Sequence, residues 1–303
     1  MKRILITGGS GTVGTAFIKK YYDTFKFYNY SRNETHIAKL KQNYPHVENF
    51  IGDVCDLTRL INVFEQVQPD IVIHAAALKH VNLAEENPTA AVEVNVNGSH
   101  NVIQASIRAN VPLTIGISTD KACDPDSIYG YTKRIMERMF MEHNNKKTKF
   151  VCTRFANVTG SNGSVIPFWK NLAEQDLPLK LTSTSMNRLM FSKEAAAELI
   201  LKAYHYACII DESFILSNIM KTVNMLDLAH VISDKPPTIV GLRPGEKLNE
   251  TLISKKELSY TKVKRNYVFI FNTQQSSKDN LKHEHSSLTA EKMPKSELKK
   301  LIE

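Results

Sequence analysis

The feature that most constrains the fold of this chain is a regular alternation of short apolar runs with longer amphipathic ones, through the first half of its 303 residues. The short runs have the length and composition of buried strands, and the long ones repeat apolar residues with the period of a helix. The expected strands cover residues 3–7, 26–30, 47–51, 70–74, 113–118 and 150–154, and the expected helices cover 13–22, 35–44, 57–67, 84–109 and 129–143. This order predicts an α/β fold with a doubly wound parallel sheet, covered by helices on both faces through right-handed crossovers.

The rhythm loosens after residue 155, where a glycine-rich loop at 157–164 is followed by short irregular pieces. One clear helix is expected near residues 193–207, and a polar loop precedes a last helix near 295–302. We therefore predict a Rossmann-like domain over residues 1–160, with a returning segment at about 189–215. A smaller C-terminal substrate-binding lobe and tail would be built from residues 161–188 and 216–303.

A glycine-rich turn joins the first expected strand to the first expected helix. The segment 7–14, TGGSGTVG, contains both a GxGxxG and a GxxGxxG pattern. Glycine lets the backbone of such a turn approach a pyrophosphate, and the first N–H groups of the following helix point toward it. A glycine pattern alone is weak, but its place between a strand and a helix predicts a dinucleotide site here.

The end of the second expected strand indicates which dinucleotide binds. An NAD enzyme usually carries an acid there to hold the ribose 2′-hydroxyl, whereas this chain carries Ser31 and Arg32. A guanidinium forks onto phosphate oxygens that an acid would repel, so the position favours NADP over an exposed arginine without a role. Asp53, after the third strand, either bonds the adenine amine or caps the next helix. The N-terminal domain is thus predicted to bind NADP.

A threonine and a Tyr-x-x-x-Lys pattern form the candidate catalytic centre. Tyr129 and Lys133 are four residues apart, which places them on one face of a helix. An ammonium beside a phenol lowers its pKa, so Tyr129 could exchange a proton with a substrate hydroxyl. Thr119 ends a strand at the carboxyl edge of the sheet, where doubly wound folds bind ligands.

Net charge and cysteine content indicate which kinds of ligand and partner the protein binds. Lys and Arg number 39 against 31 Asp and Glu, a net charge of +8, yet no basic stripe carries interleaved aromatics, so nucleotide phosphates are favoured over nucleic acid. The four cysteines are far apart, with no CxxC pair or nearby histidine, so we expect reduced thiols and no metal site. Without a signal peptide or an apolar run of about 18 residues, the sequence predicts a soluble, cytoplasmic protein with no membrane partner.

The glycine turn and the YGYTK segment at 129–133 resemble the extended short-chain dehydrogenase/reductase superfamily. A narrower resemblance is to the UDP-N-acetylglucosamine 4,6-dehydratases of polysaccharide biosynthesis. It rests on the segments 74–80 (HAAALKH), 118–122 (STDKA), 163–167 (GSVIP) and 243–247 (RPGEK), with 286–289 and 298–302 near the C-terminal end. Apart from that end, the resemblance runs from Met1 to about Ile270.

This resemblance implies a reaction and a set of roles. NADP would oxidise carbon 4 of the hexose, which makes the hydrogen on carbon 5 acidic; the 6-hydroxyl then leaves as water and the cofactor is regenerated. Tyr129 would be the base for the 4-hydroxyl, Asp120 the acid and Lys121 the base at carbon 5, with Thr119 and Lys133 completing the catalytic set. The resemblance also implies a UDP-sugar substrate and a homo-oligomer, a dimer or larger.

Motifs and resemblance together predict two sets of binding residues. The cofactor set is Thr7, Gly8, Gly11, Thr12, Val13, Gly14, Ser31, Arg32, Asp53, Val54, Ala75, Ala76, Ala77, Asn95, Tyr129 and Lys133. The substrate set is Lys79, Asn157, Ser164, Val165, Pro167, Met186, Arg188, Arg243 and Glu246. Within the second set, Met186-Asn187-Arg188 departs from the Met-Thr-Arg usual in the family.

Several alternatives stay open at this point. A 4-epimerase or ketoreductase acting on a nucleotide sugar would share the glycines, Thr119, Tyr129 and Lys133, but would not need the Asp120-Lys121 pair. A non-catalytic NADP-sensing interaction protein would need no intact Tyr-x-x-x-Lys. The pair itself could be a surface salt bridge, Asn95 could brace the central helix, and His74 is more often a core histidine than a ligand. Retention or inversion at carbon 5 is not decided by the sequence.

Overall fold

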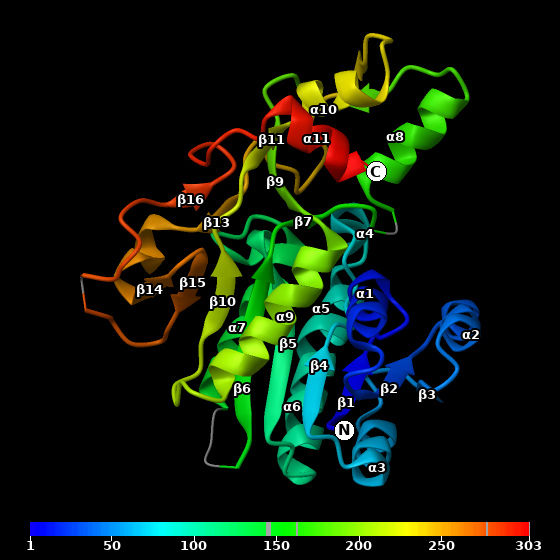
Figure 1. Cartoon of the computed structure of the whole chain (residues 1–303), viewed down its shortest axis with the longest axis vertical. Coiled ribbons are helices and arrows are strands. Elements are labelled where there is room, and N and C mark those ends of the chain that lie inside the picture. Colours follow the sequence, from blue (N-terminus) through cyan, green and yellow to red (C-terminus); the bar gives the residue numbers. More distant parts are fainter. Residues whose placement is uncertain (144–146, 162, 277, 303) are drawn as a thin grey trace.

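A nine-stranded sheet forms the centre of the molecule (Figure 1). The computed structural model describes residues 1–143, 147–161, 163–276 and 278–302. The strands from β10 to β3 are parallel, and β15 pairs antiparallel with both β10 and β14. In order across the sheet the strands are β14 (Thr261–Lys264), β15 (Tyr267–Ile270), β10 (Ile215–Asn218), β6 (Lys149–Phe155), β5 (Leu113–Thr119), β4 (Ile71–His74), β1 (Arg3–Thr7), β2 (Lys26–Ser31) and β3 (Glu48–Ile51).

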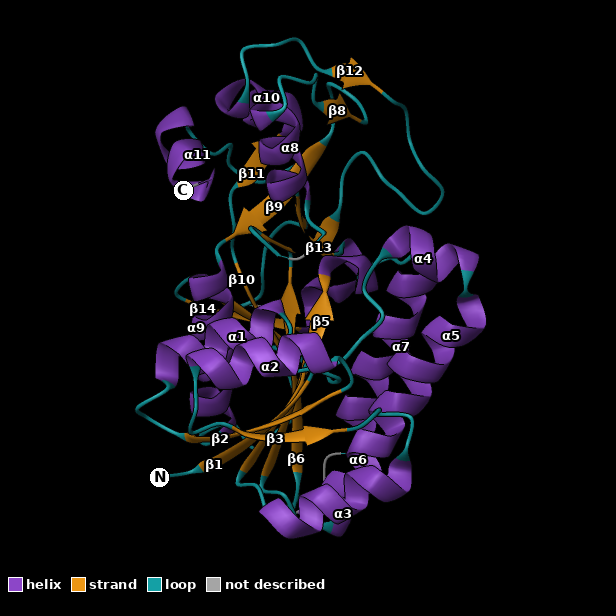
Figure 2. Ribbon diagram, turned by 90° about the vertical axis from the view of Figure 1, so that its right-hand side faces the viewer, coloured by secondary structure: helices purple, strands orange, loops and turns teal. Residues whose placement is uncertain are grey.

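Helices cover both faces of this sheet (Figure 2). One face carries α1 (Thr12–Tyr21), α2 (Glu34–Asn43) and α9 (Lys193–Ala207), and the other carries α3 (Leu57–Val67), α6 (Gly98–Arg108) and α7 (Ile128–Glu142). The side chains of β1 alternate between the faces: Ile4 and Ile6 pack in the cluster that includes α1 and α9, and Leu5 packs with α3 and α6. Burying each such side chain contributes about 1.5–3 kcal/mol. The predicted doubly wound sheet is confirmed.

The segment expected as one helix over 84–109 is instead four pieces. It comprises α4 (Val81–Glu86), α5 (Pro88–Val92), the π-helix η1 (Glu93–Asn97) and α6. Asn87 has non-helical angles, φ −133° and ψ 62°, and Pro88 follows it as the first residue of α5. Proline has no N–H for a helical hydrogen bond and disfavours helical angles in the residue before it, so a helix ends and another begins at this point.

A second lobe has its own hydrophobic core beyond the carboxyl ends of the parallel strands (Figures 1 and 2). Trp169, Leu228 and Leu298 are among its buried side chains, so the C-terminal helix packs there. Its elements are α8 (Val165–Glu174), α10 (Met225–Ile232), α11 (Lys295–Ile302), β7 (Asn157–Val158), β8 (Lys180–Leu181), β9 (Asn187–Phe191), β11 (Thr222–Asn224) and β12 (Thr238–Ile239). The pair β13 (Thr251–Ile253) and β16 (His285–Ser286) and the 3₁₀ turn η3 (Lys255–Tyr260) lie between this lobe and the sheet.

One part of the predicted domain division is corrected by the sheet topology. The strands β14 and β15 fall in the range assigned to the substrate lobe, yet they extend the main sheet from its β10 edge. Antiparallel addition at an edge needs only a tight turn and no crossover helix, so the alternation of strands and helices could not reveal it.

The order of strands reverses at β1, which has β2 on one side and β4 on the other. Successive crossovers move away from this point in both directions, and the connecting loops leave a crevice at the carboxyl ends of β1 and β4. Ligands of doubly wound folds bind at such a switch point, so the loops after these two strands are where a site is expected.

Candidate active site

Two adjoining cavities lie at the carboxyl edge of the sheet. The first, about 610 Å³, is lined by the glycine turn and by the residues that follow β2, β3, β4 and β5. The second, about 570 Å³, is lined mostly by the second lobe. Lys121, Asn157, Val158 and Ser161 line both. The two cavities therefore meet beside Lys121.

The glycine turn has the close packing that a pyrophosphate site needs. Gly8 has φ +74°, and a Cβ there would lie 2.8 Å from the backbone nitrogen of Ala76. A Cβ on Gly14 would lie 2.5 Å from Gly9 Cα, so α1 could not approach the turn. The N-cap of α1 is Gly11, which has no side chain to cap the first N–H groups. Those groups border the first cavity, where an anionic phosphate would satisfy them.

Arg32 and Asp53 border the same cavity at the ends of β2 and β3. Arg32 Nη1 lies 2.9 Å from Asp53 Oδ2, and the Arg32 side chain is 61% exposed. Burial alone would raise the pKa of Asp53, but a hydrogen bond from the Cys55 N–H and the Arg32 guanidinium hold it below its usual value. The Ser31 hydroxyl donates to Asn29 Oδ1 at 2.7 Å, so it is held within the protein. His36, which sequence reasoning missed, also lines this end.

The catalytic candidates follow β5 in the 3₁₀ turn η2 (Asp120–Ala122). Thr119 Oγ1 donates to Asp120 Oδ1 at 2.8 Å, and Lys121 Nζ lies 3.2 Å from the same oxygen. Asp120 is 1% exposed, and its other oxygen, Oδ2, is buried without a hydrogen-bond partner in the part of the chain that the structure describes. The two residues form an ion pair, as in the salt-bridge alternative, but not on the open surface: Asp120 is buried and the Lys121 side chain, 19% exposed, faces the cavities.

Tyr129 and Lys133 lie in the first cavity, one helical turn apart on α7. Burial raises the pKa of Tyr129 to about 12, and the charge of Lys121 opposes that rise. The sequence predicted this effect for Lys133, whereas the charge that opposes the rise is that of Lys121. Burial lowers the pKa of Lys133 to about 8, and its Nζ contacts Met136 Sδ at 3.0 Å.

Glu250 is the functional candidate that sequence reasoning missed. It is 3% exposed, lines the second cavity, and its Oε1 lies 3.3 Å from Lys121 Nζ. It follows the 243–247 segment by three residues, directly before β13. Nothing in its local sequence distinguishes it from other acids, because its partner is brought to it only by the tertiary fold.

Most predicted binding residues line one of the cavities. The first is lined by Gly8, Gly11, Thr12, Val13, Gly14, Ser31, Arg32, Asp53, Val54, Ala75, Ala76, Ala77, Lys79, Thr119, Asp120, Lys121, Tyr129 and Lys133. The second is lined by Asn157, Ser164, Val165, Met186, Arg188, Arg243 and Glu246. Ser164 Oγ is buried and no described residue bonds it, so it is available to a ligand. The Arg188 guanidinium donates to the backbone carbonyls of residues 187, 247 and 248, which holds the loop before Glu250.

Three predicted residues, Thr7, Asn95 and Pro167, line neither of these two cavities. Thr7 is buried with its Oγ1 2.7 Å from His74 Nδ1. Asn95 bonds the backbone of Leu78 and the hydroxyl of Thr132, so it braces α7 and the loop after β4. Pro167 is exposed on α8.

His74 is a core histidine. It is fully buried between the hydroxyls of Thr7 and Ser99, and burial lowers its pKa to about 3. A histidine that remains neutral at physiological pH and is hydrogen-bonded on both ring nitrogens has a structural role.

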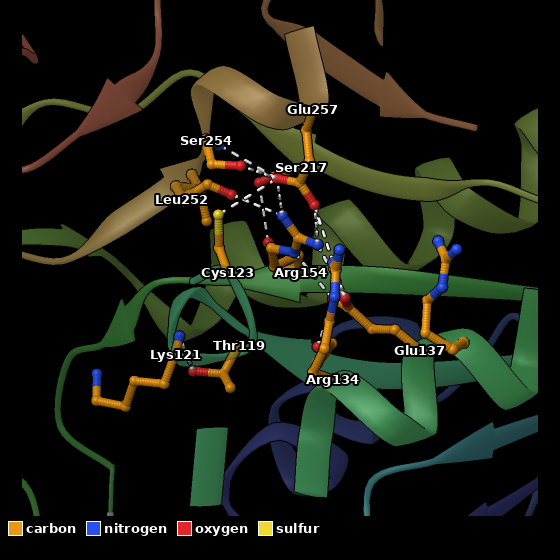
Figure 3. Close-up of polar contacts among 12 residues, drawn as sticks. Thr119, Lys121, Cys123, Arg134, Glu137, Arg154, Ser217, Leu252, Ser254 and Glu257 are labelled. Atoms are coloured by element: carbon orange, nitrogen blue, oxygen red, sulfur yellow. Dashed lines mark hydrogen bonds and ion pairs between the residues drawn. The ribbon is translucent and has the colours of Figure 1, made fainter. Parts of the chain in front are cut away.

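A second buried ion-pair cluster, centred on Arg154, lies near Thr119 and Lys121 (Figure 3). Arg154 on β6 is 0% exposed and donates five hydrogen bonds, to Glu137 on α7, Glu257 on η3 and the Leu252 carbonyl. Burial would raise the pKa of Glu257, but the Arg154 guanidinium holds it well below its usual range. This cluster ties the helix that carries Tyr129 to the sheet and to the segment 250–257.

The fold, the glycine turn and the Tyr-x-x-x-Lys helix beneath a second lobe define a Rossmann-type protein of the extended short-chain dehydrogenase/reductase class. Residues 4–272 match the family described as polysaccharide biosynthesis protein, and the chain belongs to this family. The resemblance predicted from the sequence is confirmed.

Similar proteins agree with this membership. The chain is 38% identical over 280 residues to the inverting UDP-N-acetylglucosamine 4,6-dehydratase of Campylobacter jejuni, covering 89% of this chain and 82% of that one. It is 32% identical over 281 residues to a UDP-glucose 4-epimerase of Rickettsia bellii, covering 88% and 82%. The solved structure of Pen from Bacillus thuringiensis superposes with a TM-score of 0.91 and 29% identity, over 99% of this chain and 96% of that one.

Over the described ranges, no helix is both long enough and apolar enough to cross a membrane. The same residues contain no group of three or more His, Cys, Asp or Glu side chains that could hold a metal ion.

Proposed function

We propose that this protein dehydrates UDP-N-acetylglucosamine to a UDP-4-keto-6-deoxy-N-acetylhexosamine, in nucleotide-sugar biosynthesis for glycans. The observation that carries the proposal is the buried Asp120–Lys121 pair at the junction of the two cavities, close to Tyr129. An epimerase or simple reductase needs a phenol and a cofactor but no additional acid and base. We further propose inversion at carbon 5, because the similar Campylobacter jejuni enzyme is named an inverting one.

The first cavity fits a pyridine nucleotide. The N-terminal end of α1 would hold its pyrophosphate, and Lys133 would hold its nicotinamide ribose from the buried side. When bound, the nicotinamide would take two electrons and a hydrogen from carbon 4 and return them at carbon 6. NADP is the proposed form, because the exposed Arg32 guanidinium can turn from Asp53 to a 2′-phosphate.

The protein's own groups would move three protons. Tyr129 would take the proton of the 4-hydroxyl, aided by the positive charge of Lys121. Neutral Lys121 would take the proton from carbon 5, and Asp120 would protonate the departing 6-hydroxyl. Carbon 5 would regain a proton, exchangeable with solvent, when the hydrogen returns at carbon 6. Proton exchange across the 3.2 Å Lys121–Asp120 contact would prepare both groups together, since it leaves a neutral amine beside a carboxylic acid.

The second cavity would hold the UDP-sugar. The exposed Arg243 would pair with its phosphates, and Ser164 and Asn157 would bond the sugar or the uridine. We propose that the protein acts in the cytoplasm as a homo-oligomer, a dimer or larger, without a metal, a membrane or a nucleic acid.

One incubation tests the proposed function. Purified protein with NADP and UDP-N-acetylglucosamine should yield, by NMR, a 4-keto-6-deoxy sugar with a new methyl signal. In deuterated water, carbon 5 should carry deuterium. A 4-epimerase, the activity named for the Rickettsia bellii relative, would instead give a sugar that keeps its 6-hydroxyl and its hydrogen at carbon 5. If the protein bound the cofactor but turned over no UDP-hexose, it would instead be a non-catalytic NADP-sensing interaction protein.

A further inference from the structure

Glu250 contacts the catalytic turn from a distant part of the chain, and both it and Lys121 line the second cavity. Asp120 and Lys121 follow β5 of the main sheet, whereas Glu250 precedes β13, next to the second lobe. The Lys121 amine lies 3.2 Å from Asp120 Oδ1 and 3.3 Å from Glu250 Oε1. The amine is thus held between two carboxylates that are 1% and 4% exposed.

The backbone of Glu250 is fixed by a turn near the C-terminal end. Its N–H donates to Ser287 Oγ at 3.0 Å, and the Ser287 N–H donates to the Glu250 carbonyl at 2.8 Å. Ser287 is in turn anchored, because its carbonyl accepts a bond from the Thr222 hydroxyl at 2.7 Å. A buried carboxylate on a backbone held in this way cannot move far from the amine.

The charges around the amine come from four elements. The Lys121 amine interacts electrostatically with Asp120 on its own turn and with Glu250 before β13. Arg188 on β9 interacts electrostatically with the amine and with Glu250, and Tyr129 on α7 interacts with the amine and with Asp120. Burial alone would lower the pKa of Lys121, but the two carboxylates raise it above its usual value. Burial raises the pKa of Glu250, and the charge of Lys121 opposes that rise.

We propose that Glu250 is a positioning residue for Lys121: it holds the amine beside Asp120 and stabilises the ammonium that forms when Lys121 takes a proton from the substrate. This inference rests on the proposed function. In the step concerned, the C–H bond at carbon 5 breaks and an N–H bond forms on Lys121. The electron pair forms the double bond between carbons 5 and 6, and the 6-hydroxyl leaves with a proton from Asp120 as water. Glu250 forms and breaks no bond to the substrate.

The test compares Glu250→Gln with the wild type, using Glu174→Gln on the exposed surface of α8 as the matched control. UDP-N-acetylglucosamine with NADP in deuterated water is the probe, and deuterium entry at carbon 5 is followed across a pH series. The wild-type rate should fall at high pH, where the Lys121–Asp120 pair loses the proton that its two groups exchange. In Glu250→Gln this fall should begin at lower pH, and the maximal rate should decrease on the order of 10-fold, because a less basic amine is a weaker base.

A second readout needs no turnover. The ¹⁵N resonance of Lys121 Nζ, assigned by its loss in Lys121→Met, should titrate at lower pH in Glu250→Gln than in the wild type. Glu250→Asp should restore part of the shift, and it replaces Glu250→Gln if that variant does not fold. Failure of the wild type to turn over the sugar would refute the proposed function alone. An unchanged titration, or an equal loss at every pH, would overturn the role of Glu250.

Discussion

Two buried ion-pair clusters meet the same segment of the chain, and they differ in how completely their polar atoms are paired. Around Arg154, two carboxylates face two guanidinium groups, those of Arg154 and Arg134, and the five hydrogen bonds that Arg154 donates leave its guanidinium fully paired. That cluster holds Glu137 on α7 against Glu257 on η3. It lines neither of the two cavities described above.

The cluster around Lys121 is incomplete by comparison. Two carboxylates, Asp120 and Glu250, share one amine, and Asp120 Oδ2 has no partner among the described residues. Lys121 lines both cavities. A fully paired buried network is costly to disturb, whereas an unpaired buried acceptor at a cavity is available to a substrate. Loss of a charge should therefore affect folding most in the Arg154 cluster, and should affect the reaction in the Lys121 cluster, which lines the cavities.

The largest effect on folding is expected for Arg154→Met. This variant keeps much of the side-chain volume but leaves Glu137 and Glu257 as uncompensated buried carboxylates. Breaking a buried pair in this way costs about 3–5 kcal/mol. The free energy of unfolding, measured in urea, should fall by that amount relative to a surface control such as Arg108→Met. A loss below about 1 kcal/mol would mean that this cluster does not hold the fold together.

Lys121→Met should remove the base for water elimination. It also leaves the buried carboxylates of Asp120 and Glu250 without the amine that they share, so the free energy of unfolding should fall as well. Loss of a positioned general base slows its step by a factor on the order of 100 or more, so water elimination should fall by at least that much. Oxidation at carbon 4 should survive at a measurable level, because Tyr129 and Lys133 remain. Absorbance of the reduced nicotinamide follows the first step, and NMR in deuterated water follows the second. Full dehydratase activity in this variant would assign the base to another residue.

The sequence did not predict the cluster around Arg154, and it predicted only part of the cluster around Lys121. Strand and helix alternation gave the main sheet, and the bounds of α3, α9 and α11 agree with the expected helices. The Asp120–Lys121 pair was predicted because residues 118–122 resemble those of the UDP-N-acetylglucosamine 4,6-dehydratases. Arg154 and Glu257 carry no local signal, because an ion pair between a central strand and a distant turn depends on tertiary contacts alone. The same reason applies to Glu250, whose partner lies more than a hundred residues earlier.

A third ion pair, Arg32–Asp53, differs from both buried clusters because it is exposed at the edge of the first cavity. It therefore tests what a charge contributes when water surrounds it. Exposed pairs contribute about 0–1 kcal/mol to stability, so Arg32→Ala should unfold almost as the wild type does. Loss of a charge-assisted phosphate contact should weaken NADP binding by about 1.5–3 kcal/mol and leave NAD binding nearly unchanged. Calorimetric titration of both cofactors measures the two affinities. An unchanged ratio would remove Arg32 from the cofactor site.

Asp120→Asn should change stability far less than Arg154→Met, and this contrast separates the two clusters most directly. The amide keeps an oxygen for the Thr119 hydroxyl, and Glu250 still pairs with the Lys121 amine, so no buried charge is left alone. The free energy of unfolding should fall by only about 1–2 kcal/mol, because the change weakens one contact of the Lys121 amine and leaves the contact with Glu250 in place. Water elimination should nevertheless be slowed on the order of 100-fold, because an amide cannot protonate the departing hydroxyl. Parallel urea unfolding of Asp120→Asn and Arg154→Met gives the comparison within one set of conditions. If both variants lost several kcal/mol, Asp120 would belong to the framework of the fold, and the unpaired Oδ2 would no longer indicate a site for substrate.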